Sequence, residues 1–235
     1  DWYEIDVPSN WNIVGIGHDG SQRFGTPIYV NVNVPWWKEI KPDDWRLGVM
    51  RTPPEDWTMY RMRNEVGSYR RSFTLPEGWA GDRIYINFDG VDSFFYLWIN
   101  GRYVGFSKNS RNTAQFDITR FVREGSNVVA VEVYRNSDAG NLEAQDMFRL
   151  PGIFRTVALE AKPQTTVRDL RVTPSLTGLH VEAEILGAGA GVTIDWKLYE
   201  HPLYSDENAL VAAFDRQAPA CDLSFPAAKP RCAVR

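Results

Sequence analysis

The chain has 235 residues, of which 43% are hydrophobic and 24% charged, with a formal net charge of −4. These proportions are ordinary for a globular protein, and the length suffices for one large or two smaller domains. The sequence has neither the basic patch of a nucleic-acid-binding protein nor an apolar run long enough to span a membrane, so it indicates no nucleic-acid or membrane partner.

The first part of the chain, residues 1–35, is rich in turn residues and predicts short strands joined by loops. Residues 36–67 contain four Trp and three Pro among many charges, and neither a helical nor a strand period persists. We expect a long, ordered surface loop there. Two interpretations stay open: the loop packs on its own tryptophans, or it is a lid or partner contact beside a ligand site.

The strongest local signal is the pair Asn100-Gly101, which lies between two apolar segments at residues 94–99 and 103–106. An Asn-Gly pair in this setting predicts a tight β-hairpin, because both turn residues must adopt positive φ. Alternation of apolar and polar residues predicts four further strands, at residues 68–75, 83–88, 128–134 and 156–161.

Pro163 marks a predicted domain boundary. Beyond it, residues 166–172, 179–185, 192–199 and 209–214 predict four strands of a second β-sandwich. Residues 219–235 show no periodicity and are expected to be loose, so the second sandwich is incomplete or has its last strands in this tail. Two cysteines there, Cys221 and Cys232, could pair, and they do not decide between a cytoplasmic and a periplasmic or secreted protein. Strands do not alternate with helices, which excludes a (β/α)₈ barrel.

A series of motifs in the middle of the chain resembles a known family. The motifs are Phe88-Asp89-Gly90-Val91, Trp98-Ile99-Asn100-Gly101-Arg102, Val104-Gly105, Ser110-Arg111, Phe116-Asp117, Gln145-Asp146-Met147 with Arg149, and Gly152-Ile153-Phe154-Arg155. They resemble the N-terminal sugar-binding domain of the family 2 glycoside hydrolases, most closely that of the large β-galactosidases. The resemblance extends upstream through Val7–Trp11 and Pro27–Val32, and it departs from the family at residues 36–67, where the relatives are shorter.

The resemblance implies an all-β fold. Residues 1–163 would form a jelly-roll (galactose-binding-domain-like) β-sandwich, and residues 164–235 a partial immunoglobulin-like β-sandwich with a loose tail. The implied function is that of the non-catalytic N-terminal portion of a β-galactosidase, which hydrolyses terminal β-D-galactosides. This portion would line the galactose pocket and support a catalytic barrel of the same polypeptide, in an enzyme expected to be a homo-oligomer.

Two substrate-binding residues carry over from the resemblance. The amide of Asn31 would bond a sugar hydroxyl, since amides both donate and accept. Asp146 would accept from a sugar hydroxyl and ligate a sodium ion, whose remaining ligands would come from the barrel, where magnesium is also possible. Plainer interpretations are a strand-end amide for Asn31 and a salt bridge to Arg149 for Asp146.

Catalytic residues are not expected in this chain. Glycoside hydrolysis needs two carboxylates, and in the resembling family both are glutamates at the ends of barrel strands, so the chain alone should be inactive. Asn64-Glu65 imitates the family's Asn-Glu acid/base pair, but it precedes a sandwich strand, and we expect no catalytic role. Asp89, Asp92 and Asp117 are expected to anchor turns, and Ser110, Arg111 and Arg155 to hold loops.

Two other functions stay open. The chain could be a free-standing carbohydrate-binding module, since fold does not fix function. It could also be the same region of a family 2 β-glucuronidase or β-mannosidase, although the motifs around Asn31 and Asp146 favour galactosides.

Overall fold

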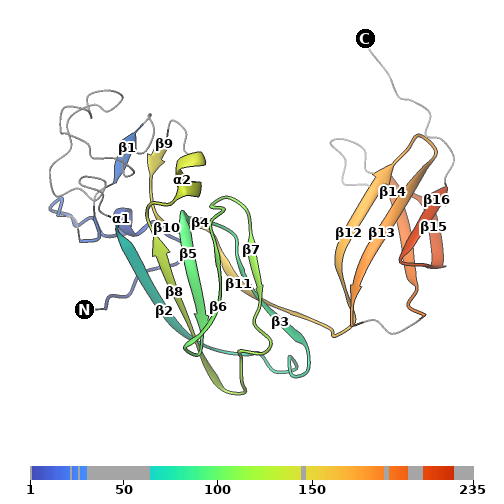
Figure 1. Cartoon of the computed structure of the whole chain (residues 1–235), viewed down its shortest axis with the longest axis horizontal. Coiled ribbons are helices and arrows are strands. Elements are labelled where there is room, and N and C mark those ends of the chain that lie inside the picture. Colours follow the sequence, from blue (N-terminus) through green and yellow to red (C-terminus); the bar gives the residue numbers. More distant parts are fainter. Residues whose placement is uncertain are drawn as a thin grey trace, which may run out of the picture. The chain divides into compact units, whose positions relative to one another are not determined.

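The structure is a computed structural model that describes residues 2–21, 23–25, 27–30, 64–143, 147–187, 191–200 and 209–224. It divides into two compact units, Asp1–Ala161 and Lys162–Arg235, with the boundary next to Pro163 (Figure 1). Strands dominate both units, which confirms the all-β prediction. Within the described ranges, neither helix is long or apolar enough to cross a membrane.

The first unit contains two short helices and a series of antiparallel strands. The helices are α1 (Trp11–Val14) and α2 (Asp138–Leu142), and the strands are β1 (Ile28–Val30), β2 (Val66–Thr74), β3 (Arg83–Phe88), β4 (Val91–Asp92), β5 (Phe94–Ile99), β6 (Arg102–Ser107), β7 (Ala114–Asp117), β8 (Ser126–Tyr134), β9 (Met147–Arg149), β10 (Gly152–Ile153) and β11 (Val157–Lys162). They form a four-stranded sheet in the order β2-β8-β5-β6, a three-stranded sheet β11-β3-β7, and the two-stranded pairs β1-β9 and β10-β4.

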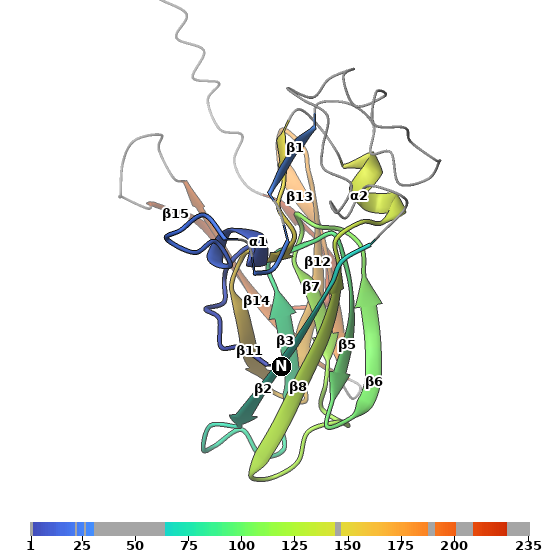
Figure 2. The ribbon, with the colours of Figure 1, turned by 90° about the vertical axis from the view of Figure 1, so that its left-hand side faces the viewer.

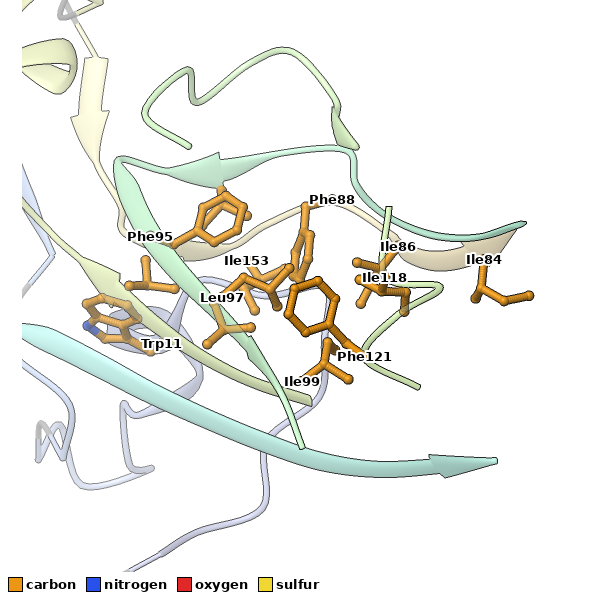
Figure 3. Packing of buried hydrophobic residues seen from close by; sticks show 13 residues of the cluster. Trp11, Ile84, Ile86, Phe88, Phe95, Leu97, Ile99, Ile118, Phe121 and Ile153 are labelled. Carbon is orange, nitrogen blue, oxygen red and sulfur yellow. The ribbon is translucent and has the colours of Figure 1, made fainter. Parts of the chain in front are cut away.

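The two larger sheets face each other and enclose the core of the first unit (Figure 2). Strand alternation sends every second side chain of β5 inward, where Phe95, Leu97 and Ile99 are at most 2% exposed. The same core cluster includes Ile84, Ile86 and Phe88 of β3, and Figure 3 shows Phe88 lying near Phe95 and Leu97, with Ile84 farther along β3. Truncating any of them to Ala should cost about 2–5 kcal/mol of stability.

The predicted hairpin is confirmed. Asn100 and Gly101 have φ of 52° and 76°, and they join β5 to β6 with Ile99 paired to Arg102. The side chain of Asn100 has a second role that the sequence did not indicate. Its Nδ2 donates to the carbonyl of Phe121 at 2.9 Å, and its Oδ1 accepts from the backbone N–H of Val128 at 2.9 Å. The turn is therefore tied to β8 as well as to its own strands.

Helix α1 differs from the strands and loops predicted for residues 1–35. It buries Trp11, whose ring lies against Gly67 in β2 so closely that a Cβ at Gly67 would come 2.5 Å from a ring carbon. Strand β2 also begins at Val66 rather than at the predicted residue 68. The expected loop at 36–67 lies outside the described residues up to residue 63, so its structure is not described.

The second unit contains two antiparallel sheets in its described part. Strands β12 (Thr166–Pro174), β13 (Gly178–Leu186) and β16 (Ala220–Ser224) form one sheet, and β14 (Ile194–Glu200) pairs with β15 (Ala209–Gln217). The expectation of a loose tail is wrong for Ala220–Ser224, because this segment pairs with β13 and buries Leu223. Residues 225–235, including Cys232, lie outside the described residues.

Candidate functional site

The two predicted substrate-binding residues, Asn31 and Asp146, lie outside the described residues. Their neighbours in sequence are described, and they are paired. Strand β1 runs antiparallel to β9, with Tyr29 opposite Phe148 and Val30 opposite Met147. The last residue before Asn31 is thus the ladder partner of the first residue after Asp146. The fold brings together the two described segments that adjoin the predicted residues in sequence.

A group of charged side chains surrounds the end of β9, which we call the ionic cluster. Its members are Glu65 before β2, Asp92 in β4, Arg111 before β7, Arg135 after β8, Glu143 after α2 and Arg149 in β9. The three arginines and three carboxylates balance in charge. Sequence reasoning missed the cluster because its members are far apart along the chain, and no spacing motif connects them.

Two ion pairs form the centre of the ionic cluster. Arg135 Nη1 lies 2.7 Å from Glu65 Oε2, and the Arg135 side chain is only 1% exposed while that of Glu65 is 23% exposed. Arg111 Nη2 lies 3.1 Å from Asp92 Oδ2. Asp92 was expected to anchor a turn, and that prediction is wrong: its carboxylate is paired with Arg111 across the sandwich edge. The same prediction is confirmed for Asp117, whose Oδ1 accepts the backbone N–H of Thr119 at 3.0 Å.

Burial dominates the electrostatics of the ionic cluster. It raises the pKa of the Asp92 carboxyl above its usual value, although the neighbouring Arg111 acts in the opposite direction. Burial also lowers the pKa of Arg135, with Glu65 opposing the shift, and lowers the pKa of Arg149. The charges of Asp92, Arg135 and Arg149 are therefore held at some desolvation cost, which oppositely charged neighbours partly offset.

A small hollow lies inside the ionic cluster, with a volume of about 20 Å³. Asp92, Arg135, Asn136 and Arg149 are among its lining residues. Asn136 Nδ2 and Arg149 Nε are buried there with no hydrogen-bond partner in the described part of the chain. The hollow has room for about one water molecule, which would satisfy such donors, and it is far smaller than the ~300 Å³ at which ligand pockets begin. Taken alone, the described residues support a site edge and do not enclose a sugar.

Asn64-Glu65 has a structural role that the sequence did not predict. Besides the ion pair of Glu65, the side chain of Asn64 exchanges two hydrogen bonds with the backbone of Asn136, each 2.9 Å long. These contacts fasten the start of β2 to the end of β8. A carboxylate committed to a buried arginine is poorly placed to donate a proton to a leaving group.

The loop residues also behave as predicted. Arg155 Nη1 donates to the carbonyl of Arg111 at 2.8 Å, and both guanidinium groups lie over the ring of Phe154. The buried Ser110 N–H donates to the Glu143 carboxylate at 3.0 Å. Across the ranges that the structure describes, no group of three or more His, Cys, Asp or Glu could hold a metal ion.

Comparison with known proteins identifies related chains. Residues 48–163 match the family described as "Glycosyl hydrolases family 2, sugar binding domain". A β-galactosidase of Priestia megaterium is 41% identical over 184 residues, covering 78% of this chain and 16% of that protein. A β-galactosidase of Pseudoalteromonas haloplanktis is 39% identical over 185 residues, covering 79% of this chain and 15% of that protein. The chain thus spans about one sixth of the length of these relatives.

Solved structures share the fold at lower identity. A β-glucuronidase of an uncultured Clostridium species superposes with a TM-score of 0.57 at 19% identity, covering 75% of this chain and 32% of that chain. A Bacteroides uniformis β-glucuronidase gives a TM-score of 0.57 at 17% identity, covering 97% of this chain and 23% of that chain. At these identities the likeness concerns the fold alone.

Proposed function

The chain carries the N-terminal sugar-binding domain of a family 2 glycosyl hydrolase over residues 48–163, and from this premise we propose that it is the non-catalytic front portion of a β-galactosidase that hydrolyses terminal β-D-galactosides. The observation that carries the proposal is the 41% identity over 184 residues to a β-galactosidase of which the chain spans only 16%. The solved β-glucuronidases resemble the chain in fold only, so they give little support to a glucuronide substrate.

Within the full enzyme, Asn31 and Asp146 would line one wall of the galactose pocket. The pairing of Val30 with Met147 supports this role. In the sequence, Asn31 directly follows Val30 and Asp146 directly precedes Met147. An amide and a carboxylate together offer a sugar both a donor and acceptors.

Asp146 would also contribute one ligand to a sodium ion shared with the catalytic barrel. A carboxylate is a hard oxygen ligand suited to such a cation. The described residues hold no cluster that would complete the coordination, so the other ligands would come from the barrel, as would any magnesium site. The ionic cluster beside β9 would serve as a rigid support for this edge, because precise sites need side chains whose surroundings are fixed.

The test is hydrolysis of nitrophenyl β-galactoside by the complete native gene product and its Asp146→Ala variant at several sodium concentrations. The expected result is a raised KM and a weakened response to sodium. Asp138→Ala is the matched control, because Asp138 is an exposed carboxylate that pairs with the surface Lys108 at 2.9 Å and accepts the backbone N–H of Ala139 at 2.8 Å. An Asp146→Ala enzyme that behaves like Asp138→Ala would remove Asp146 from the site.

The isolated chain provides the second arm of the test. It should show no turnover, because glycoside hydrolysis needs two opposed carboxylates, and Glu65 is committed to Arg135. Turnover by the isolated chain that is lost in Glu65→Gln would contradict the proposal. A full-length product that hydrolyses only glucuronides or mannosides would redirect it to another enzyme of the same family.

A further inference from the structure

The outer surface of the four-stranded sheet is unusually aromatic. Strand alternation places the even-numbered residues of β5 on the side opposite the core, and neighbouring strands add further rings. We call this set the aromatic face, which consists of Phe94, Tyr96, Trp98, Tyr103, Phe106 and Tyr134. Tyr103 and Phe106 are 51% and 54% exposed. Exposed aromatic patches of this kind mark interaction sites more often than isolated surface rings do.

The rings of the aromatic face touch one another in a continuous series. Phe94 stacks on Phe106 with centroids 5.6 Å apart, and Tyr96 meets Phe94 at 4.7 Å. Tyr96 continues to Trp98 at 5.9 Å, and Trp98 to Tyr103 at 6.0 Å. Each ring limits the rotamers of the next, so a ligand that lies on them orders few side chains. Such preorganisation lowers the entropic cost of binding.

The polar groups of the aromatic face suit an uncharged, hydroxyl-rich ligand. Tyr96 is paired across the sheet with Glu132, whose carboxylate accepts a hydrogen bond from the Tyr134 hydroxyl at 3.0 Å. A carboxylate can accept several hydrogen bonds, so Glu132 can accept from ligand hydroxyls besides Tyr134, and the phenol groups can donate and accept. An anionic ligand would meet the charge of Glu132, whereas the C–H face of a sugar ring can lie on an aromatic ring while its hydroxyls reach these polar groups.

The size of the aromatic face argues against a second protein copy as its occupant. Six aromatic side chains of 150–250 Å², two about half exposed and four less so, present roughly 300–500 Å². A stable protein interface covers about 800 Å² on each partner. The rings alone cover less than that, and Phe94, Tyr96 and Trp98 follow one another along β5, which suits a short linear ligand.

We propose that the aromatic face is an additional carbohydrate-binding surface that takes an uncharged oligosaccharide. The rings of β5 and β6 stack on the sugar faces, and Glu132 accepts hydrogen bonds from sugar hydroxyls. This goes beyond the pocket role proposed for Asn31 and Asp146, and it holds whether or not the full enzyme is a β-galactosidase.

The test is a titration of the 235-residue chain with β-1,4-linked galactotetraose and, separately, cellotetraose, followed by tryptophan fluorescence and two-dimensional NMR. Saturable binding is expected for at least one of them. The double variant Tyr103→Ala/Phe106→Ala should weaken it by about tenfold or more, because two stacking contacts are lost. Both rings are exposed, so the variant should keep its fold, which circular dichroism checks.

Two controls separate this surface from other sites. Phe148→Ala removes an equally exposed ring that is on β9 and not in the aromatic face, and it should leave the affinity unchanged. Tyr199→Ala removes an exposed ring on β14 of the second unit, and it should also leave the affinity unchanged. Absence of saturable binding to both saccharides, binding unaffected by the double variant, or a dimer that Phe106→Ala dissociates would each overturn the proposal.

Discussion

The ion pair between Glu65 and Arg135 gives the sharpest prediction about the first unit. Glu65→Gln keeps the size of the side chain but removes its charge, and it leaves Arg135, whose side chain is 1% exposed, buried with no carboxylate at 2.7 Å. Breaking a buried pair by removing one partner costs about 3–5 kcal/mol. Glu65 is itself 23% exposed, so water can screen part of the loss, and we expect the lower end, near 3 kcal/mol.

The assay is urea denaturation of the chain, monitored by tryptophan fluorescence. Asp138→Asn is the matched control, because it breaks an ion pair of similar length, 2.9 Å, whose side chains are both exposed, and such pairs contribute about 0–1 kcal/mol. The double variant Glu65→Leu/Arg135→Leu should recover much of the loss, since it removes both buried charges. If Glu65→Gln costs no more than Asp138→Asn, burial of the pair does not matter energetically, and the reasoning is wrong.

Three further predictions concern other positions. Gly67→Ala should cost about 1–3 kcal/mol, because the new methyl would overlap the Trp11 ring, and denaturation of Ser68→Ala on the opposite face gives the baseline. Asn100→Ala should cost about 1–3 kcal/mol of stability, because it leaves the Phe121 carbonyl and the Val128 N–H without their side-chain partner. A loss of only a few tenths of a kcal/mol would mean that the Asn100 side chain does not stabilise the turn and that backbone conformation alone does. Burial raises the pKa of the Asp92 carboxyl in the folded state, so the protonated carboxyl stabilises the fold below its usual pKa of 3.8, and this contribution is lost as pH rises through the folded-state pKa. In a series of denaturation experiments, the free energy of unfolding of the wild type relative to Asp92→Asn should therefore fall with rising pH. A difference that stays constant with pH would contradict the burial argument.

Local patterns accounted for much of the first unit. Residues 94–99 alternate strictly between core and surface, and they form β5 with the predicted ends. The Asn100-Gly101 turn was predictable because its positive φ angles depend on two adjacent residues. Gly67 shows where such reasoning ends. Nothing local distinguishes it, since its role depends on the Trp11 ring that packs on it from another part of the chain.

Long-range contacts explain the features that the sequence did not predict. Strand β16 is only five residues long, and it forms because β13 offers an edge that pairs with Cys221 and Leu223. The ionic cluster unites Glu65, Asp92 and Arg135 from three separate strand ends, and no spacing rule predicts such a meeting. The predicted site residues came from a motif resemblance, and Asn31 and Asp146 stay predictions because they lie outside the described residues.

The central claim is that the chain is the front portion of a larger β-galactosidase. The most direct test is the intact mass of the native gene product from its source cells, measured together with its activity on nitrophenyl β-galactoside. The account predicts a product several times heavier than the 26.8 kDa of this chain, and one that hydrolyses the galactoside. A product near 26.8 kDa that binds galactosides without cleaving them would contradict it and would make the chain a free-standing carbohydrate-binding module.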